Sequence, residues 1–355
     1  MTELNSPTEL PRTGPAAFQI RQATPEDNTA LLALDRQCVV AAATPVGFDR
    51  SPDFFARSRP YAHWRAYVAE DDTGLIGVGA MALKPVLVGG RSVEAAYFYD
   101  LRVAPSSRRL GVAKAVGDAI RAYTHALRPA VAYSLVMEGN VASLTFVQGR
   151  GSRPMRLCWL SLIPVEGIAA ADPSRLKVLD TSELASALHL ARAAHPDHDL
   201  FPFPDVSSVQ DRFCRLDGSG FEGLYGWEEG GSLAGCFGVW DYSPIMRMRI
   251  LQARGEWSWA EGRDLHLVFL TPLGFRDTRG LAEVVRLTAA RLRRSPAPGV
   301  ARVLAFTHDQ ADSAYAELDQ FRPIRMGFTL FGLAVGGEGA PSLGSRPVFV
   351  DPADL

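Results

Sequence analysis

The chain has 355 residues, 47% of them hydrophobic and 21% charged, and a formal net charge of −2, which is typical of soluble globular proteins rather than nucleic-acid-binding ones. No apolar run approaches 18 residues, and residues 1–17 lack the apolar core of a signal peptide, so we expect no membrane span and no secretion. Four scattered cysteines argue against a disulfide framework or a zinc knuckle, and they predict a cytoplasmic protein.

Hydrophobic periodicity predicts alternating strands and helices in the first half of the chain. Strands are expected at Phe18–Ala23, Ala66–Glu70, Gly74–Leu83, Ala96–Val103, Val131–Met137 and Arg156–Leu162. Helices are expected at Asn28–Val40, Gly111–Leu127 and Asn140–Gln148. This mixture around one sheet predicts an α/β (α+β) fold.

The same order of elements returns in the second half. Strands are expected at Lys177–Leu179, Gly223–Glu228, Ser232–Trp240, Leu265–Leu270, Ala301–Thr307 and Arg325–Val335. Helices are expected at Ser182–Ala194, Gly280–Arg294 and Gln310–Leu318. The length of the chain also favours two domains. We place them at residues 18–165 and 176–335, with a linker at 166–175, a flexible tail at 1–17 and a C-terminal tail at 336–355.

An internal repeat relates the two halves. A shift of 169 residues aligns residues 101–156 with 270–325 without a gap, and twelve of the 56 positions are identical. Ordinary residue usage would give about four matches. The identities include Gly111 with Gly280, and the run Arg153-Pro-Met-Arg156 with Arg322-Pro-Ile-Arg325. The halves are therefore two copies of one fold.

The segment from Leu101 to Ala113 indicates a binding site. Its sequence, Leu-Arg-Val-Ala-Pro-Ser-Ser-Arg-Arg-Leu-Gly-Val-Ala, reads as a buried strand, a short loop and the start of a helix. The first N–H groups of a helix have no partner within it, and the helix dipole adds partial positive charge. Gly111 permits a ligand to approach the backbone closely. The segment therefore predicts a diphosphate-binding site.

The pattern Arg108-x-x-Gly111-x-Ala113 resembles the acetyl-CoA motif of the GNAT N-acetyltransferase superfamily, which has Gln/Arg-x-x-Gly-x-Gly/Ala after a strand. The resemblance covers residues 18–165 well and 175–335 in outline. It implies two tandem GNAT-like domains, each with a mixed, mostly antiparallel sheet flanked by helices. It also implies that the acetyl group of acetyl-CoA is transferred to a primary amine of a small molecule or peptide by direct attack, without a metal.

The resemblance implies a set of residues that bind coenzyme A (CoA). The strand end would pair with the pantetheine arm, the motif would hold the diphosphate, and Asn140 and Ser143 would reach the pantetheine. Asn140 can also be read as a helix cap, which is compatible with that role. The implied residues are Leu101, Arg102, Val103, Arg108, Arg109, Leu110, Gly111, Val112, Ala113, Lys114, Asn140, Ser143 and Phe146.

The catalytic residues are less clearly marked. Many members of the superfamily place a tyrosine acid seven residues after the asparagine, where this chain has Val147. Tyr97 occupies the position at which some members place a carboxylate base, and Asp100 is the nearest carboxylate. We take Asp100, Tyr97 and Tyr99 as catalytic candidates. Asp100 can also be read as the paired polar end of a strand.

The second copy has lost the first residue of the motif. Asp277 stands where the first copy has Arg108, and a carboxylate beside a diphosphate repels it by about 4 kcal/mol at close range. Pro272 replaces Val103 and removes an N–H from the strand end. We expect this half to bind no CoA, to support the fold and to form a wall of the acceptor pocket.

Two other functions remain open from the sequence. One is a regulatory protein that binds acyl-CoA without turnover, and the other is an aminoacyl transferase that uses aminoacyl-tRNA, which the CoA motif and the lack of a basic stripe disfavour. We expect an amine-bearing partner, no nucleic acid, and a monomer or homodimer. The histidines of His195-Pro-Asp-His198 are expected in a solvated loop, not as metal ligands.

Overall fold

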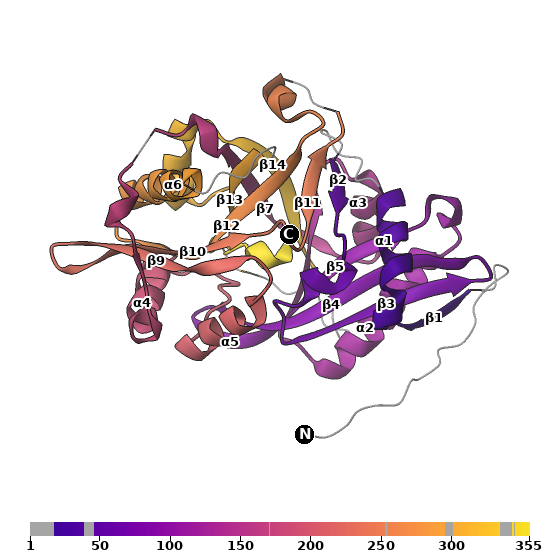
Figure 1. Cartoon of the computed structure of the whole chain (residues 1–355). Coiled ribbons are helices and arrows are strands. Elements are labelled where there is room, and N and C mark those ends of the chain that lie inside the picture. The colour runs from indigo at the N-terminus through magenta and orange to yellow at the C-terminus, as the bar shows by residue number, and fades with distance from the viewer. Residues whose placement is uncertain are drawn as a thin grey trace.

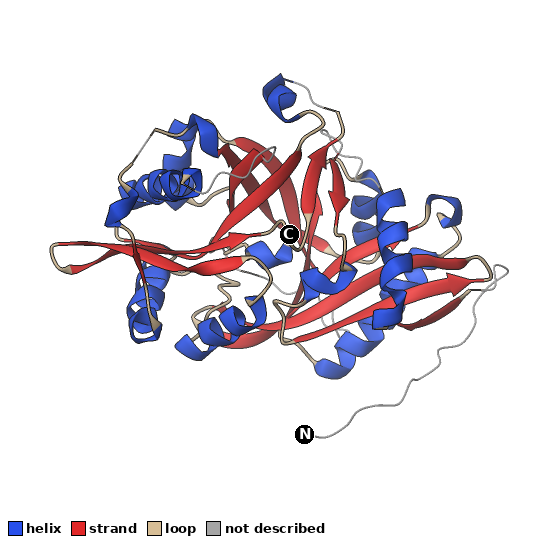
Figure 2. Cartoon of the chain, in the orientation of Figure 1, coloured by secondary structure: helices blue, strands red, loops and turns tan. Residues whose placement is uncertain are grey.

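A computed structural model describes residues 18–38, 46–169, 171–252, 255–294, 301–333, 343 and 345–355. Over these residues, fourteen strands form one sheet that runs through both halves of the chain and is flanked by helices (Figures 1 and 2). The first half, indigo to magenta in Figure 1, lies beside the second half, magenta to yellow. This arrangement confirms the mixed, mostly antiparallel α/β fold predicted from the sequence.

The first half follows the predicted order, and most of its strands are longer than predicted. Its elements are β1 (Gln19–Gln22), α1 (Asn28–Gln37), β2 (Val46–Asp49), β3 (His63–Asp71), β4 (Gly74–Val88), β5 (Arg91–Val103), α2 (Val112–Leu127), β6 (Val131–Met137), α3 (Val141–Gly149) and β7 (Arg153–Pro164). Strand β2 was not predicted, because only four residues form it and it pairs with a strand from the other half.

The second half repeats this plan. Its elements are β8 (Lys177–Val178), α4 (Leu184–Ala194), α5 (Val206–Leu216), β9 (Phe221–Glu229), β10 (Ser232–Asp241), β11 (Arg247–Ile250), β12 (Asp264–Phe275), α6 (Thr278–Arg293), β13 (Ala301–Asp309) and β14 (Ile324–Gly332). The helix expected at Gln310–Leu318 is a 3-10 segment, Ser313–Phe321, and α5 and β11 were not predicted.

The strand order reveals how the two copies are joined. It runs β1-β3-β4-β5-β6-β14-β7-β13-β12-β10-β9-β8. The order is the same from either end when β5 is matched with β12, β6 with β13, and β7 with β14. At the centre, β14 lies between β6 and β7, and β7 lies between β14 and β13. Each half therefore completes its sheet with the last strand of the other half.

The repeated Arg-Pro-x-Arg run lies at this exchange. It forms the first four residues of β7 in the first copy, and in the second it spans the start of β14. These strands pair antiparallel, with Cys158 opposite Phe328 and Trp159 opposite Gly327. The shift of 169 residues carries Cys158 to Gly327 and Trp159 to Phe328, so the local twofold axis passes between these pairs. The run persists in both copies because both halves need these strands.

The exchange changes the predicted domain division. Residues 18–165 do not contain β14, which the first half-sheet includes, and residues 176–335 do not contain β7, which the second half-sheet includes. The boundary near residues 166–175 thus marks the end of a repeat in sequence rather than the edge of a self-contained sheet.

Helix α2 packs closely on the sheet of the first half. Gly77 and Gly79 of β4 lie beneath it, and a Cβ atom added at these positions would meet Val112 Cγ1 at 2.5 Å and Val116 Cγ1 at 2.9 Å. Small residues on the strand therefore let the start of α2 approach β4, which fixes where the loop before the helix lies. Among the described residues, no helix is long and apolar enough to cross a membrane.

Two other expectations differ from the structure. The C-terminal tail is not loose at its end, because Asp351 and Asp354 are buried with 0% and 2% of their surface exposed. His195 and His198 are buried rather than solvated. His198 Nε2 lies 2.8 Å from Asp312 Oδ2, and His195 Nε2 lies 3.0 Å from the Tyr315 hydroxyl. Within the described ranges, no group of three or more potential ligands could hold a metal ion.

Candidate functional site

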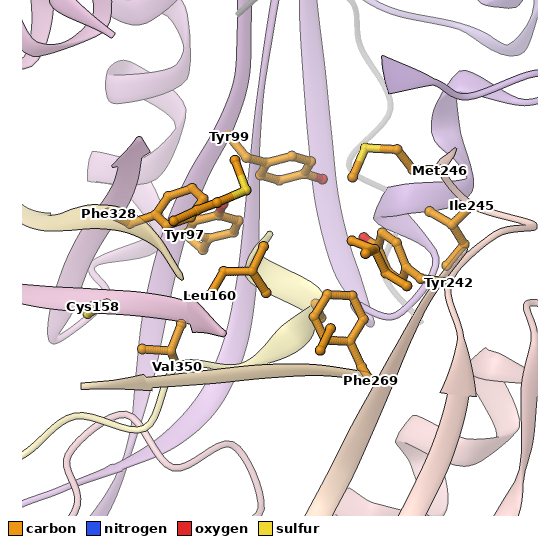
Figure 3. Close-up of a cluster of buried hydrophobic side chains, with 14 of the residues drawn as sticks. Tyr97, Tyr99, Cys158, Leu160, Tyr242, Ile245, Met246, Phe269, Phe328 and Val350 are labelled. Atoms are coloured by element: carbon orange, nitrogen blue, oxygen red, sulfur yellow. The ribbon is translucent and has the colours of Figure 1, made fainter. Parts of the chain in front are cut away.

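A cavity of about 210 Å³ passes through the sheet of the first half. On one face it is lined by α2 and α3, through residues such as Arg121 and Phe146. On the other face it is lined by Tyr97 and Tyr99 together with side chains from the second half. Figure 3 shows Tyr97 and Tyr99 of β5 turned toward the same space as Leu160, Met246 and Phe269, which come from three other segments. The cavity thus joins the two faces of the sheet.

The cavity crosses the sheet where β5 and β6 separate. These strands run parallel and pair from Ala95–Val131 to Tyr97–Tyr133. Beyond that point these described strands no longer pair with each other, although β5 still pairs with β4 and β6 with β14. Asp100 follows, with a φ angle of 57° that is uncommon for residues other than glycine. The pairing of β4 with β5 also shifts register between Val78 and Ala80. We name the separation beyond Tyr97 and Tyr133 the β5–β6 opening.

The second half is closed at the equivalent position. Strands β12 and β13 pair from Leu265–Ala301 to Phe269–Ala305. The 169-residue shift places the last first-half pair, Tyr97–Tyr133, on His266–Arg302, so the second half has three further pairs. Phe269 occupies the position of Asp100 and continues the strand. The second copy therefore lacks the opening as well as the arginine of the motif.

The loop at residues 108–113 precedes and enters α2, and we name it the amide loop. Arg109 and Gly111 have φ angles of 67° and 86°, and the helix begins at Val112. A Cβ atom at Gly111 would meet nothing within 4 Å, so the space before the helix is open. Successive amides in such a loop form an anion-binding concavity.

In the second copy, the space before the equivalent helix α6 is occupied by the side chain of Asp277. The Asp277 side chain accepts a hydrogen bond of 3.1 Å from the Gly280 backbone N–H. Asp277 is therefore the N-cap of α6, and its carboxylate already accepts the hydrogen bond that the Gly280 N–H could otherwise donate to a ligand. The contrast supports the prediction that only the first half offers these amides to a ligand.

The cofactor residues implied by the sequence fall into two groups. Those that line the cavity are Leu101, Arg102, Asn140, Ser143 and Phe146. The others lie on the strand end, the amide loop and the first turn of α2, outside the cavity; they are Val103, Arg108, Arg109, Leu110, Gly111, Val112, Ala113 and Lys114. Asn140 caps α3 through a 3.2 Å bond from Ser143 N to its Oδ1, as its capping interpretation predicted.

The catalytic candidate Asp100 is held by two arginines. Its carboxylate lies 2.6 Å from Arg50 Nη1 and 2.5 Å from Arg57 Nη1, and all three side chains are buried. Burial alone would raise the pKa of the Asp100 carboxyl, but the two guanidinium groups hold it below its usual range. This carboxylate is a poor proton acceptor. Asp100 is thus a paired polar residue of the strand, with Arg50 and Arg57 as its partners.

The other two candidates, Tyr97 and Tyr99, stack with ring centroids 5.3 Å apart. Burial raises the pKa of both hydroxyl groups above the usual range for tyrosine, so both stay protonated at neutral pH. The Tyr97 hydroxyl donates to the backbone oxygen of Asp354, and the Tyr99 hydroxyl lies 2.8 Å from Ser58 Oγ. They can donate hydrogen bonds but are unsuited to act as bases.

The cavity also includes a carboxylate that the sequence analysis missed. Asp354 lines the cavity, and its Oδ2 lies 2.6 Å from the Tyr133 hydroxyl and 2.7 Å from Lys84 Nζ. Lys84 also contacts Asp351 at 3.0 Å, and Asp351 binds Arg212 of α5. Burial is the main cause that raises the pKa of the Asp354 carboxyl. No motif marks these residues, because they meet only in the folded chain.

The residues of this site fit a CoA thioester. Ser134 and Ser152 are buried, line the cavity near α3, and have hydroxyl groups without a hydrogen-bond partner among the described residues. Unpaired buried hydroxyl groups suit a ligand rich in amides, as pantetheine is. The open amide loop suits a diphosphate at the outer end of the same path.

Comparisons with known proteins agree with this fold. The sequence matches no family model and no curated protein. The structure is similar to Saccharomyces cerevisiae N-myristoyltransferase with bound myristoyl-CoA (TM-score 0.63, 13% identity, 97% of this chain and 87% of that chain covered). It is also similar to a tandem GNAT protein from the clavulanic acid biosynthesis pathway (TM-score 0.57, 14% identity, 88% and 97% covered).

A third similar structure is a probable N-acyltransferase of unknown function from Enterococcus faecalis V583, with a TM-score of 0.50, 10% identity, and coverage of 89% of this chain and 72% of that chain. At such identities, the comparisons establish the fold. Together with the internal repeat, the strand order and the β5–β6 opening, they show that the chain has the tandem GNAT fold.

Proposed function

We propose that the chain is an N-acyltransferase with one working site, in its first half. The site binds a CoA thioester and transfers the acyl group to a primary amine of a small molecule or peptide. The amide loop holds the diphosphate, and Asn140, Ser143 and the backbone of Leu101–Val103 hold the pantetheine arm. Acetyl-CoA is the simplest donor of this class and the one that the motif at 108–113 implies.

The observation that carries this proposal is that the first half has the β5–β6 opening and the second half has no equivalent of it. The first half pairs β5 with β6 only as far as Tyr97–Tyr133, whereas the second half continues to Phe269–Ala305. A cavity runs through the opening, and the amide loop lies before α2 on the same half. Both features are needed to bring a thioester to an amine.

The reaction needs little covalent chemistry from the protein. The neutral amine attacks the thioester carbonyl, the C–N bond forms, the C–S bond breaks, and the proton lost by nitrogen ends on sulfur. A backbone N–H at the end of β5 would polarise the carbonyl and contribute roughly 3 kcal/mol to the transition state. Sulfur is a tolerable leaving group because the pKa of a thiol is about 8.5. Turnover is therefore compatible with a valine at position 147, where many members of the superfamily have a tyrosine acid.

We assign to Asp354, rather than to Asp100, the uptake of the proton that nitrogen loses, before that proton passes to the thiolate. Asp354 lines the cavity, and burial raises the pKa of its carboxyl, which makes it a better proton acceptor than an ordinary aspartate. Asp100 instead acts as a positioning residue: its two arginines hold the strand where β5 leaves β6.

Titration calorimetry with CoA tests which half binds it. Gly111→Glu and Arg108→Asp, which copies the second half, should abolish binding and leave the thermal unfolding transition intact. Arg279→Ala, at the equivalent exposed helix start of the second half, should bind as the unaltered protein does. Binding that survives both substitutions in the first half, or that is lost in Arg279→Ala, contradicts the assignment.

Thiol release from acetyl-CoA, measured with a library of amines, tests the reaction. The alternative function is an acyl-CoA-binding regulatory protein, which the ion-paired Asp100 and the missing tyrosine at Val147 favour. Tight CoA binding without thiol release for any amine would select that alternative. The absence of both binding and release would exclude both functions.

A further inference from the structure

The part of the cavity beyond the β5–β6 opening is apolar, and we name it the apolar chamber. Its principal walls are Leu160, Met246, Met248, Phe269, Met326 and Phe328. Each has at most 9% of its surface exposed. These residues pack in the same core as Tyr97 and Tyr99, whereas Val112, Val116 and Ile120 of α2 pack in a separate core with Val78 and Ala96. The chamber therefore lies across the sheet from α2.

The second half builds most of the chamber. Met246 precedes β11, Met248 lies on it, Phe269 lies on β12, and Met326 and Phe328 lie on β14. Figure 3 shows Met246 and Phe269 facing Tyr99 and Leu160 across the chamber. The half that has lost the amide loop and the opening thus supplies the wall of the first half's site.

The chamber offers a ligand no unpaired acidic side chain among the described residues. Two acidic side chains line the cavity among the described residues, and both are paired: Asp100 with Arg50 and Arg57, and Asp354 with Lys84. A protonated amine placed among the methionine and phenylalanine side chains would lose its hydration without gaining a counter-ion. An uncharged aliphatic group would lose only contact with water, which is favourable.

We infer that the chamber receives the acyl group of the donor, and that this group is aliphatic and larger than acetyl. The inference rests on the proposed function, since a thioester held along β5 and α3 would carry its acyl group to the β5–β6 opening. A cavity of about 150 Å³ lined by leucine, isoleucine and phenylalanine holds benzene. The whole cavity, of which the chamber is one part, measures about 210 Å³, so it has room for an acyl group larger than acetyl.

The methionines bear on selectivity. Met246, Met248 and Met326 have flexible, unbranched side chains that adjust to ligands of different shape. We expect donors of neighbouring chain lengths to be accepted, with affinity rising until the chamber is filled and then levelling off.

The first test measures the affinity of the unaltered protein for CoA, acetyl-CoA, butyryl-CoA, hexanoyl-CoA and octanoyl-CoA by calorimetry without an acceptor. Each buried methylene should raise affinity by up to about fourfold. Hexanoyl-CoA should bind at least tenfold more tightly than acetyl-CoA. Equal affinity across the series overturns the acyl-chamber inference but leaves the transferase proposal intact. A failure to bind any member, CoA included, overturns both.

A second test reduces the chamber. Met246→Phe adds a ring to its wall and should lower affinity for hexanoyl-CoA about tenfold without changing affinity for CoA. Met81→Phe is the matched control, because Met81 is fully buried in the core beneath α1 and α2 and does not line the cavity. An unchanged preference in folded Met246→Phe contradicts the inference. If that variant does not fold, Met248→Phe takes its place, and the series with the unaltered protein remains decisive.

A third experiment distinguishes whether the chamber holds the acceptor amine or the acyl group. Thiol release is measured with acetyl-CoA and primary amines of increasing apolar size. If apolar amines raise turnover while donor affinity is independent of chain length, the chamber holds the acceptor and the inference is wrong. If donor chain length governs affinity and amine size has no such effect, the chamber holds the acyl group.

Discussion

At the scale of single residues, Asp100 shows how one side chain shapes the opening. A φ angle of 57° is unfavourable for aspartate by about 1 kcal/mol or more, and the cost is offset where surrounding groups hold the residue. Here Arg50 and Arg57 both bind its carboxylate. The interaction fixes the backbone where β5 leaves β6, although Asp100 contributes no base.

Asp100→Ala should destabilise the fold by about 3–5 kcal/mol, because two buried arginines lose their partner. Asp100→Asn should cost less, since asparagine accepts one of these hydrogen bonds and adopts positive φ more readily than alanine. Denaturant unfolding measures both. Asp72→Ala, in the exposed turn between β3 and β4, is the control and should change stability by less than about 0.5 kcal/mol. Similar losses of stability in Asp100→Ala and Asp72→Ala would show that the ion pairs of Asp100 do not stabilise the fold.

The proton acceptor assigned to Asp354 has a pH signature. Burial raises the pKa of this carboxyl, and only its ionised form accepts a proton. Activity should therefore be present at neutral pH and fall as pH decreases through a pKa above that of an ordinary aspartate, which is about 3.9. Asp354→Asn should lower kcat and remove this acidic limb from the profile of kcat/KM. A limb that persists in folded Asp354→Asn belongs to another group.

At the scale of elements, the two central helices begin differently although they descend from one repeat. The loop before α2 leaves its amides open and includes two residues with positive φ, whereas α6 begins at a conventional aspartate N-cap. The associated strands differ too, because β12 continues to pair where β5 has already separated. Restoring a single residue cannot restore the site.

Asp277→Arg, which returns the lost arginine to the second copy, should leave CoA binding at one molecule per chain. The substitution also removes an N-cap and should cost about 1 kcal/mol of stability. Calorimetric stoichiometry and denaturant unfolding measure the two effects. A second equivalent of CoA would show that the arginine alone determines binding and that the closed strands do not matter.

The elements also show what sequence patterns can predict. Most strands and helices, the repeat, and the loop at 108–113 were predictable because each depends on neighbouring residues. Strands β2 and β11 were missed because they are short and are stabilised by pairing with each other across the halves. Asp354 was missed because the Gly- and Pro-rich sequence before it indicates a tail, and its position depends on Lys84 and Tyr133, which are distant in the sequence.

At the scale of the whole molecule, the exchange of β7 and β14 makes the halves interdependent. Periodicity predicted both strands but could not assign their partners, since a buried strand has the same pattern in either sheet. The same exchange gives a structural role to a half that lacks the β5–β6 opening. It supplies a central strand and most of the apolar chamber.

Residues 18–165 produced alone should not unfold cooperatively, because β6 and β7 lose the strand that lies between them. Co-production of residues 1–169 with 170–355 should restore the sheet. Circular dichroism during thermal unfolding and CoA titration distinguish these outcomes. A separate first half that unfolds cooperatively and binds CoA would show that the exchanged strand is dispensable.

The position of β14 has a consequence for synthesis on the ribosome. Strand β7 emerges well before β14, and about 160 residues separate their ends in the chain. At roughly 5–20 residues per second, this interval lasts on the order of ten to thirty seconds. Throughout it, β6 presents an unsatisfied edge that other nascent chains could pair with. We therefore expect the newly made protein to depend on chaperones more strongly than its completed form would suggest.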